Sequence, residues 1–109
     1  MMNNTISDFE RKMANHPLYS HQDDLNPPIQ CHITCLWTSA HWFITEASKQ
    51  DDGDWICFGL CHITDTELGY VSLNEILKLN ENPKFCVIID TECPGNVSDA
   101  RAWLNDMYT

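Results

Sequence analysis

The sequence predicts one small α+β domain, a mainly antiparallel sheet of about five strands with two or three short helices packed on it. Three observations support this prediction: a length of 109 residues, 43% hydrophobic residues, and segments of two-residue periodicity interrupted by helix-start signals. No linker divides the chain, so residues 1–109 are expected to form a single acidic domain. We expect the helices to lie on one side of the sheet.

The first half of the chain contains one helix signal followed by three strand signals. Residues 7–10, Ser-Asp-Phe-Glu, have the form of a capping box and predict a helix to about Asn15. Residues 16–28 are rich in Pro, Asp and Asn and predict a loop. Alternating or continuous apolar residues then predict three strands, the last of which is apolar on both faces and is the expected central strand: 29–37, 41–47 and 55–62.

The second half adds two strands and two helices. Residues 68–71 predict a strand, and residues 72–75, Ser-Leu-Asn-Glu, form a second capping box that opens a helix to about Leu79. Residues 85–89 predict a buried strand. Ser98 can cap a last helix, whose inner face is expected to be formed by Ala102, Trp103 and Met107, with Leu104 beside them.

A formal net charge of −10, from 16 acidic and 6 basic side chains, favours a partner protein with a basic face. It opposes direct binding to nucleic acid or to an anionic membrane. Three groups of acids at predicted strand ends are the candidate partner-binding residues: Asp51, Asp52, Asp54, Asp65, Glu67, Asp90 and Glu92. Carboxylates about 6.7 Å apart along a strand would suit imitation of a phosphate backbone. The alternative is that these acids are solvated turn residues that keep the chain soluble.

Six cysteines raise the possibilities of disulfides and of zinc. The chain starts without a secretory signal, so we expect a reducing compartment and buried free thiols, with disulfides as a minor alternative. Residues four apart on a strand lie about 13 Å apart and cannot share one zinc ion. A cross-strand zinc site stays open, and with it the weaker alternative that the chain is a zinc-stabilised structural module, although we expect no metal and no cofactor. The pairs with this spacing are Cys31 with Cys35 and Cys57 with Cys61.

The chain contains no recognised catalytic signature, neither a phosphate-binding glycine loop nor a Gly-x-Ser-x-Gly elbow. Asp90 and Glu92 are the best carboxylate candidates, followed by Glu46 and Glu67. The adjacent Cys-His pairs at 31–32 and 61–62 point to opposite faces of a strand and form no dyad by themselves. A small enzyme, or enzyme subunit, that uses Asp90 and Glu92 or a Cys-His pair is the alternative function.

The four tryptophans are expected in the core, whereas an exposed one beside acids would suit an interface anchor; they are Trp37, Trp42, Trp55 and Trp103. No apolar run approaches the roughly 20 residues of a membrane helix, so we expect a cytoplasmic protein.

Several short motifs between residues 17 and 77 carry a resemblance. In chain order they are Pro17-Leu18-Tyr19, Trp42-Phe43-Ile44-Thr45-Glu46, Asp54, Phe58-Gly59-Leu60 and Glu67-Leu68-Gly69-Tyr70-Val71-Ser72-Leu73-Asn74-Glu75. This pattern resembles a family of small proteins catalogued as a domain of unknown function, often encoded on conjugative plasmids, integrative elements and phages. The residues after about Leu79 follow no pattern of that family.

Together these observations predict a non-enzymatic binding protein whose acidic surface engages a basic, nucleic-acid-binding partner. The mobile-element setting that the resemblance implies suggests a host nuclease or CRISPR effector component as that partner. The protein would then act as an anti-CRISPR or anti-restriction inhibitor of the DNA-mimic kind. Rim charges act mainly on association, so salt should slow binding steeply. A homodimer is left open.

Overall fold

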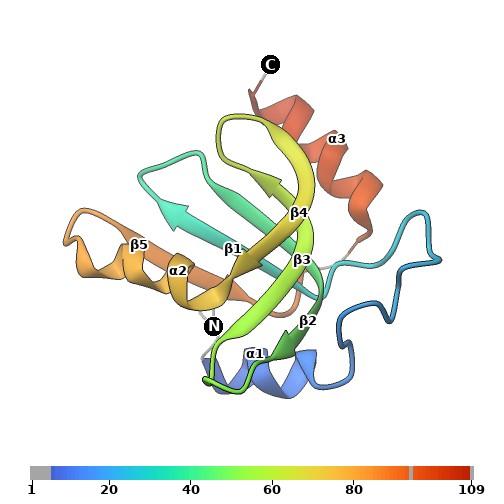
Figure 1. Cartoon of the computed structure of the whole chain (residues 1–109). Helices are drawn as coiled ribbons and strands as arrows, with labels where there is room; N and C mark the ends of the chain where they lie inside the picture. Colours follow the sequence, from blue (N-terminus) through green and yellow to red (C-terminus); the bar gives the residue numbers. More distant parts are fainter. Residues whose placement is uncertain (1–5, 94, 109) are drawn as a thin grey trace.

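One five-stranded antiparallel sheet carries all the helices of the computed structural model, which describes residues 6–93 and 95–108 (Figure 1). The strand order is β4-β3-β2-β1-β5. None of the helices in the described ranges is long and apolar enough to cross a membrane. Along the chain the elements are α1 (Ile6–Met13), β1 (Cys31–Leu36), β2 (His41–Lys49), β3 (Trp55–His62), β4 (Thr66–Ser72), α2 (Leu73–Leu77), the 3-10 helix η1 (Lys78–Glu81), β5 (Cys86–Asp90) and α3 (Val97–Tyr108).

The α+β prediction is confirmed, and each predicted strand lies within two residues of its observed bounds. The capping box at the start of α2 is also confirmed, since the Ser72 hydroxyl accepts the Glu75 N–H at 3.2 Å. The helix predicted to run to about Leu79 ends at Leu77 as an α-helix, and the 3-10 helix η1 continues the helical path to Glu81. A short 3-10 turn is a common extension at the end of an α-helix.

The central strand is β2, so the prediction that residues 55–62 are central was wrong. All of residues 41–47 are buried. Trp42 and Ile44 enter one core and Phe43 enters the other, on the opposite face of the sheet. Burial on both faces normally produces an almost continuous apolar run, and β3 has that appearance. Three polar residues concealed the burial of β2 in the sequence: His41, Thr45 and Glu46.

Helices cover both faces of the sheet, so the prediction of helices on one side was also wrong. α1 and α2 pack on the first face, where Phe9 and Ile76 join the larger core. α3 packs on the second face, where Leu104 joins Phe43 and Leu60 in a smaller core; Figure 1 shows α3 well apart from α1 and α2. The second core exists because these strands carry apolar residues at both alternating positions.

The inner face of α3 differs from the predicted one. The buried residues are Val97, Ala100 and Leu104, whose spacing of three and four residues gives one helical stripe. Trp103 and Met107 are 40% and 53% exposed. Their size suggested a buried face, but the stripe that packs against Ile29, Phe43 and Leu60 is that of the smaller residues Val97, Ala100 and Leu104.

The predicted loop over residues 16–28 is confirmed and caps α3 from outside the helix. The Asn26 side-chain oxygen accepts the Ser98 N–H at 2.8 Å, and the Asp99 carboxylate accepts the Asn96 N–H at 2.8 Å. Ser98 is therefore inside the helix and does not act as its cap. Both bonds satisfy N–H groups at the start of the helix, and the bond to Asn26 connects the loop to α3.

Candidate functional site

The seven predicted partner-binding acids lie in three separate places. The acids at 51–54 are at the β2–β3 turn, and those at 65–67 are at the other end of β3. That strand has eight residues and is about 23 Å long at roughly 3.3 Å per residue. The acids at 90–92 end β5, on the sheet edge opposite β4. The topology therefore does not join these groups into one row of carboxylates.

Several of these carboxylates stabilise turns. Asp54 accepts the N–H groups of Trp55 and Asn74 at 2.6 and 3.0 Å, and also receives the Ser72 hydroxyl. Desolvation alone would raise the pKa of Asp54, but these three hydrogen bonds together outweigh it and lower the pKa. Asp90 accepts the Glu92 N–H at 2.9 Å. Such bonds are typical of Asp in turns, so Asp54 and Asp90 have clear structural roles.

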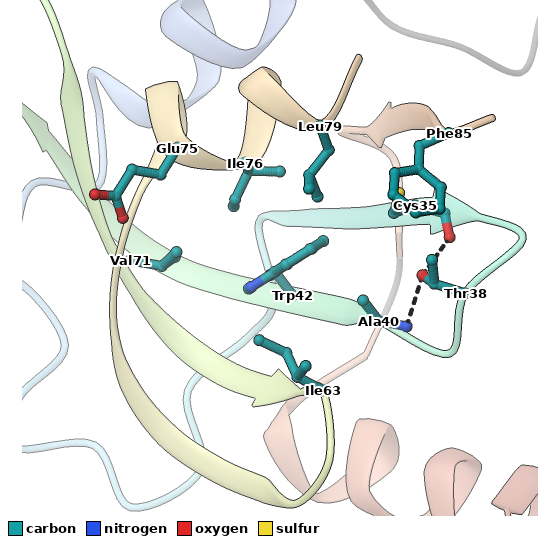
Figure 2. Close-up of a pocket in the computed structure, with 10 residues that line it drawn as sticks. All are labelled: Cys35, Thr38, Ala40, Trp42, Ile63, Val71, Glu75, Ile76, Leu79 and Phe85. Atoms are coloured by element: carbon teal, nitrogen blue, oxygen red, sulfur yellow. Dashed lines mark hydrogen bonds between the residues drawn. The ribbon is translucent and has the colours of Figure 1, made fainter. Parts of the chain in front are cut away.

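An open groove of about 370 Å³ lies on the first face of the sheet, between α2 with η1 and the strands (Figure 2). We call it the apolar groove. The Thr38 hydroxyl donates to the Cys35 carbonyl at 2.7 Å and accepts the Ala40 N–H at 3.1 Å, so its hydrogen bonds are made within the turn. Figure 2 shows Glu75 at one end of the groove. The lining residues are Cys35, Thr38, Ala40, Trp42, Ile63, Val71, Glu75, Ile76, Leu79 and Phe85.

Acidic residues lie at the rim of the apolar groove. Ile63 is 57% exposed and also lines a neighbouring hollow together with Asp65 and Glu67. Two of the predicted acids therefore lie beside an exposed apolar surface, with Glu75 in the groove itself. Sequence reasoning missed this groove. Its one local signal was Ile63, an apolar side chain at a polar turn.

An exposed tryptophan follows strand β1, next to the turn that contributes Thr38 to the groove. Trp37 is 85% exposed and adopts a positive φ of 72°. The prediction that all four tryptophans are core residues is therefore wrong for Trp37 and for the 40% exposed Trp103, and confirmed for Trp42 and Trp55. Exposed tryptophan is enriched at protein interfaces.

Three histidines from neighbouring strands gather on the second face, beneath α3. His32 Nε2 lies 3.0 Å from His41 Nδ1, and His41 Nε2 lies 2.7 Å from the Tyr108 hydroxyl. His62 stacks on Tyr108 with ring centroids 4.8 Å apart. Burial first, and then the neighbouring His41, lower the pKa of His32 to about 4; burial and His62 lower the pKa of His41. His32 and His41 are thus neutral at pH 7.

The three buried thiols, Cys31, Cys35 and Cys57, belong to the first core, whereas Cys93 lines a hollow on the second face together with His32. Cys31 is buried in the first core while His32 is on the opposite face, as the alternation of a strand predicted. Burial raises the pKa of the Cys31 thiol and raises that of Cys57 to about 12, which suppresses the reactive thiolate. The six cysteines, all within residues 6–93, form no disulfide with one another. In residues 6–93 and 95–108, no three His, Cys, Asp or Glu side chains are placed to hold a metal ion.

A protein-family model described as "Protein of unknown function (DUF2958)" matches residues 3–99 of the chain. No curated protein and no solved structure matches the chain. The family match extends beyond residues 17–77 in both directions and includes β5 and the start of α3. The prediction that residues after about Leu79 follow no family pattern was therefore wrong. The chain belongs to the family of proteins of unknown function catalogued as DUF2958.

Proposed function

We propose that this chain is a non-enzymatic binding protein that docks on a basic partner protein and accepts an apolar side chain of that partner in the apolar groove. The observation that carries the proposal is the groove itself, about 370 Å³ of open and almost wholly apolar surface. Covering such a surface is favourable by about 25 cal/mol per Å² of apolar area removed from water. Contiguous exposed apolar surface on a small domain is typical of interaction sites.

The charge of the chain supports a basic partner. Glu75 lines the groove, Asp65 and Glu67 line the neighbouring hollow that shares Ile63 with it, and the whole chain has a net charge of −10. Lysine or arginine residues that flank an apolar anchor would meet these carboxylates at the rim. Rim charges of this kind steer association and contribute less to the lifetime of the complex.

The class of partner in this proposal is a nucleic-acid-binding protein of the host cytoplasm, such as a nuclease or CRISPR effector component, whose own ligand demands a Lys- and Arg-rich surface. Three separate acid groups favour steering and local docking over a ladder of carboxylates at phosphate spacing. Inhibition would then follow from covering part of the basic surface of the partner.

The groove can be tested with matched bait proteins. Ile63→Asp places a charge at the groove, while Met107→Asp makes the same change in charge on α3, at a residue that is 53% exposed. Wild type and the Met107 variant should retain the same basic protein from a host extract, and the Ile63 variant should lose it. Mass spectrometry identifies the retained protein.

Association kinetics with the purified partner then separate the groove from the rim. Raising salt should slow association steeply, whereas Ile63→Asp should mainly speed dissociation. Equal retention by the Ile63 variant, or a retained protein without a basic surface, would show that the proposal is wrong.

A further inference from the structure

A second pocket, of about 320 Å³, lies on the face of the sheet opposite the apolar groove. It is formed by the 16–28 loop, strands β2, β3 and β4, and the start of α3. Its volume is within the range of small-ligand pockets. We call it the tyrosine pocket, and its lining residues are Tyr19, His21, Gln22, Asp24, Leu25, Pro27, Thr45, Glu46, Phe58, Leu68, Tyr70 and Val97.

An irregularity in the central strand directs two consecutive residues into this pocket. The pairing of β2 with β3 shifts register between Ile44 and Glu46. In a regular strand Thr45 and Glu46 would point to opposite faces, but both line the tyrosine pocket. Bulges that redirect a side chain in this way are over-represented next to active sites.

Glu46 places a carboxylate at the buried side of the pocket, where it is 5% exposed. Its two oxygens accept the N–H groups of Tyr19 and His21 at 2.7 and 3.1 Å. No lysine or arginine is among the described residues that line the pocket, and the ion pairs found among residues 6–93 and 95–108 do not involve Glu46. An ionised carboxylate has about four acceptor sites, so this group retains the capacity to accept hydrogen bonds from a ligand.

Aromatic rings face the same space. Phe58 and Tyr70 have ring centroids 4.9 Å apart at 56°, and the nearby Tyr19 side chain raises the pKa of the Tyr70 hydroxyl. Tyr19 and Tyr70 are 60% and 57% exposed. Tyr19 also has a φ of 72°, which is an outlier for a bulky residue. The bond from its N–H to Glu46 holds this conformation, and strain of this kind is concentrated at ligand sites.

A cavity with aromatic walls, a buried carboxylate and neither lysine nor arginine among its described lining residues has the chemistry of a cation site. Aromatic faces attract cations through the ring quadrupole, and a buried carboxylate favours a ligand that returns a positive charge to it. We propose that the tyrosine pocket binds an organic cation of the guanidinium or alkylammonium class. Glu46 accepts hydrogen bonds from the cation or neutralises its charge, and Tyr19, Tyr70 and Phe58 contact its apolar part.

The inference is independent of the apolar groove, which lies on the other face of the sheet. Choline, methylguanidinium and N-acetyl-arginine amide are the cationic probes, and 3,3-dimethyl-1-butanol is the neutral counterpart of choline. The readout is the amide chemical shifts of Tyr19 and His21, whose N–H groups bind Glu46. A cation should shift both signals to saturation, while the neutral alcohol should leave them unchanged.

The guanidinium probes also distinguish the source of the cation. Tighter binding of N-acetyl-arginine amide than of methylguanidinium identifies a side chain of a polypeptide, and the reverse identifies a free small molecule. Equal shifts with choline and its neutral counterpart, or no saturable shift with any of the cations, would overturn the proposal.

Substitutions test the aromatic wall and the Glu46 carboxylate separately. Tyr70→Phe keeps the aromatic face and should retain binding, whereas Tyr70→Leu should weaken it about three- to tenfold. Glu46→Gln should weaken it by a larger factor. Tyr108→Leu makes the same change as Tyr70→Leu outside the pocket and should have no effect on binding. Equal affinity of the Tyr70→Phe and Tyr70→Leu variants for the cations would refute the role of the aromatic wall.

Discussion

Acidification should destabilise this fold through His32, because its ring is neutral in the folded chain and becomes charged on unfolding. Burial, followed by the neighbouring His41, lowers its pKa from 6.5 to about 4, and Asp90 offsets only part of this effect. Between these two pKa values, His32 is protonated in the unfolded chain but not in the folded chain. The stabilisation is therefore complete above about pH 6.5, is lost as the pH falls towards 4, and changes no further below that value.

The size of the loss follows from the separation of the two pKa values. At 1.36 kcal/mol per pKa unit, a separation of about 2.5 corresponds to about 3 kcal/mol as an upper limit. The ring is only partly buried, so solvent screening reduces this figure to roughly 2 kcal/mol. A loss of that size is a substantial part of the 5–15 kcal/mol by which domains are generally stable.

Urea unfolding followed by tryptophan fluorescence at several pH values between 7 and 4.5 measures the loss. His32→Phe provides the comparison, because phenylalanine can keep the stacking on Phe43, 4.1 Å between ring centroids, but takes up no proton. Carboxylates titrate in both proteins and cancel in the difference. Wild type should lose roughly 2 kcal/mol more than the variant over this range. Parallel curves for the two proteins would show that His32 does not carry the effect.

Three further predictions concern the sheet, a helix cap and the thiols. Gly59→Ala should destabilise the folded protein by about 3 kcal/mol or more, because the added Cβ would lie 1.9 Å from a backbone oxygen. Gly69→Ala should have little effect, because the space around Gly69 is open. Thermal denaturation of the two variants measures the difference. Ser72→Ala should cost about 1–2 kcal/mol in urea unfolding through loss of the α2 cap. A maleimide should label the exposed Cys86 in the native protein, and should label buried Cys57 only after unfolding.

Local patterns predicted the elements well because each was read from neighbouring residues. Alternating apolar residues between 29 and 37 predicted β1, and the capping box at residues 72–75 predicted α2, without any knowledge of the fold. The order of the strands depends on pairing between distant segments, so a local pattern could not reveal it. The buried His41 and Glu46 made β2 look less central than β3, since polar residues are normally read as exposed.

The sites were harder to predict than the elements. The acids were located correctly at strand ends, but the turns at the two ends of one strand cannot converge. The apolar groove is lined by residues from distant parts of the chain, including Ile63 and Phe85. A pattern read from neighbouring residues could not predict that these side chains lie together. Glu46 was only a second-rank carboxylate in the sequence. Its burial depends on a bulge in β2 and on N–H groups from the loop at 16–28.

The central strand divides two roles between its faces. On one face Trp42, Ile44 and Ala47 are apolar and belong to the larger core. The second face holds His41 and Glu46, which burial would penalise unless their hydrogen bonds were satisfied. The Tyr108 hydroxyl lies 2.7 Å from His41, and two loop N–H groups bind Glu46. Apolar residues at these positions would need no such partners, so a strand selected for stability alone would not carry them. The polar face of β2 therefore carries a feature that stability does not explain, in addition to the apolar groove on the other face.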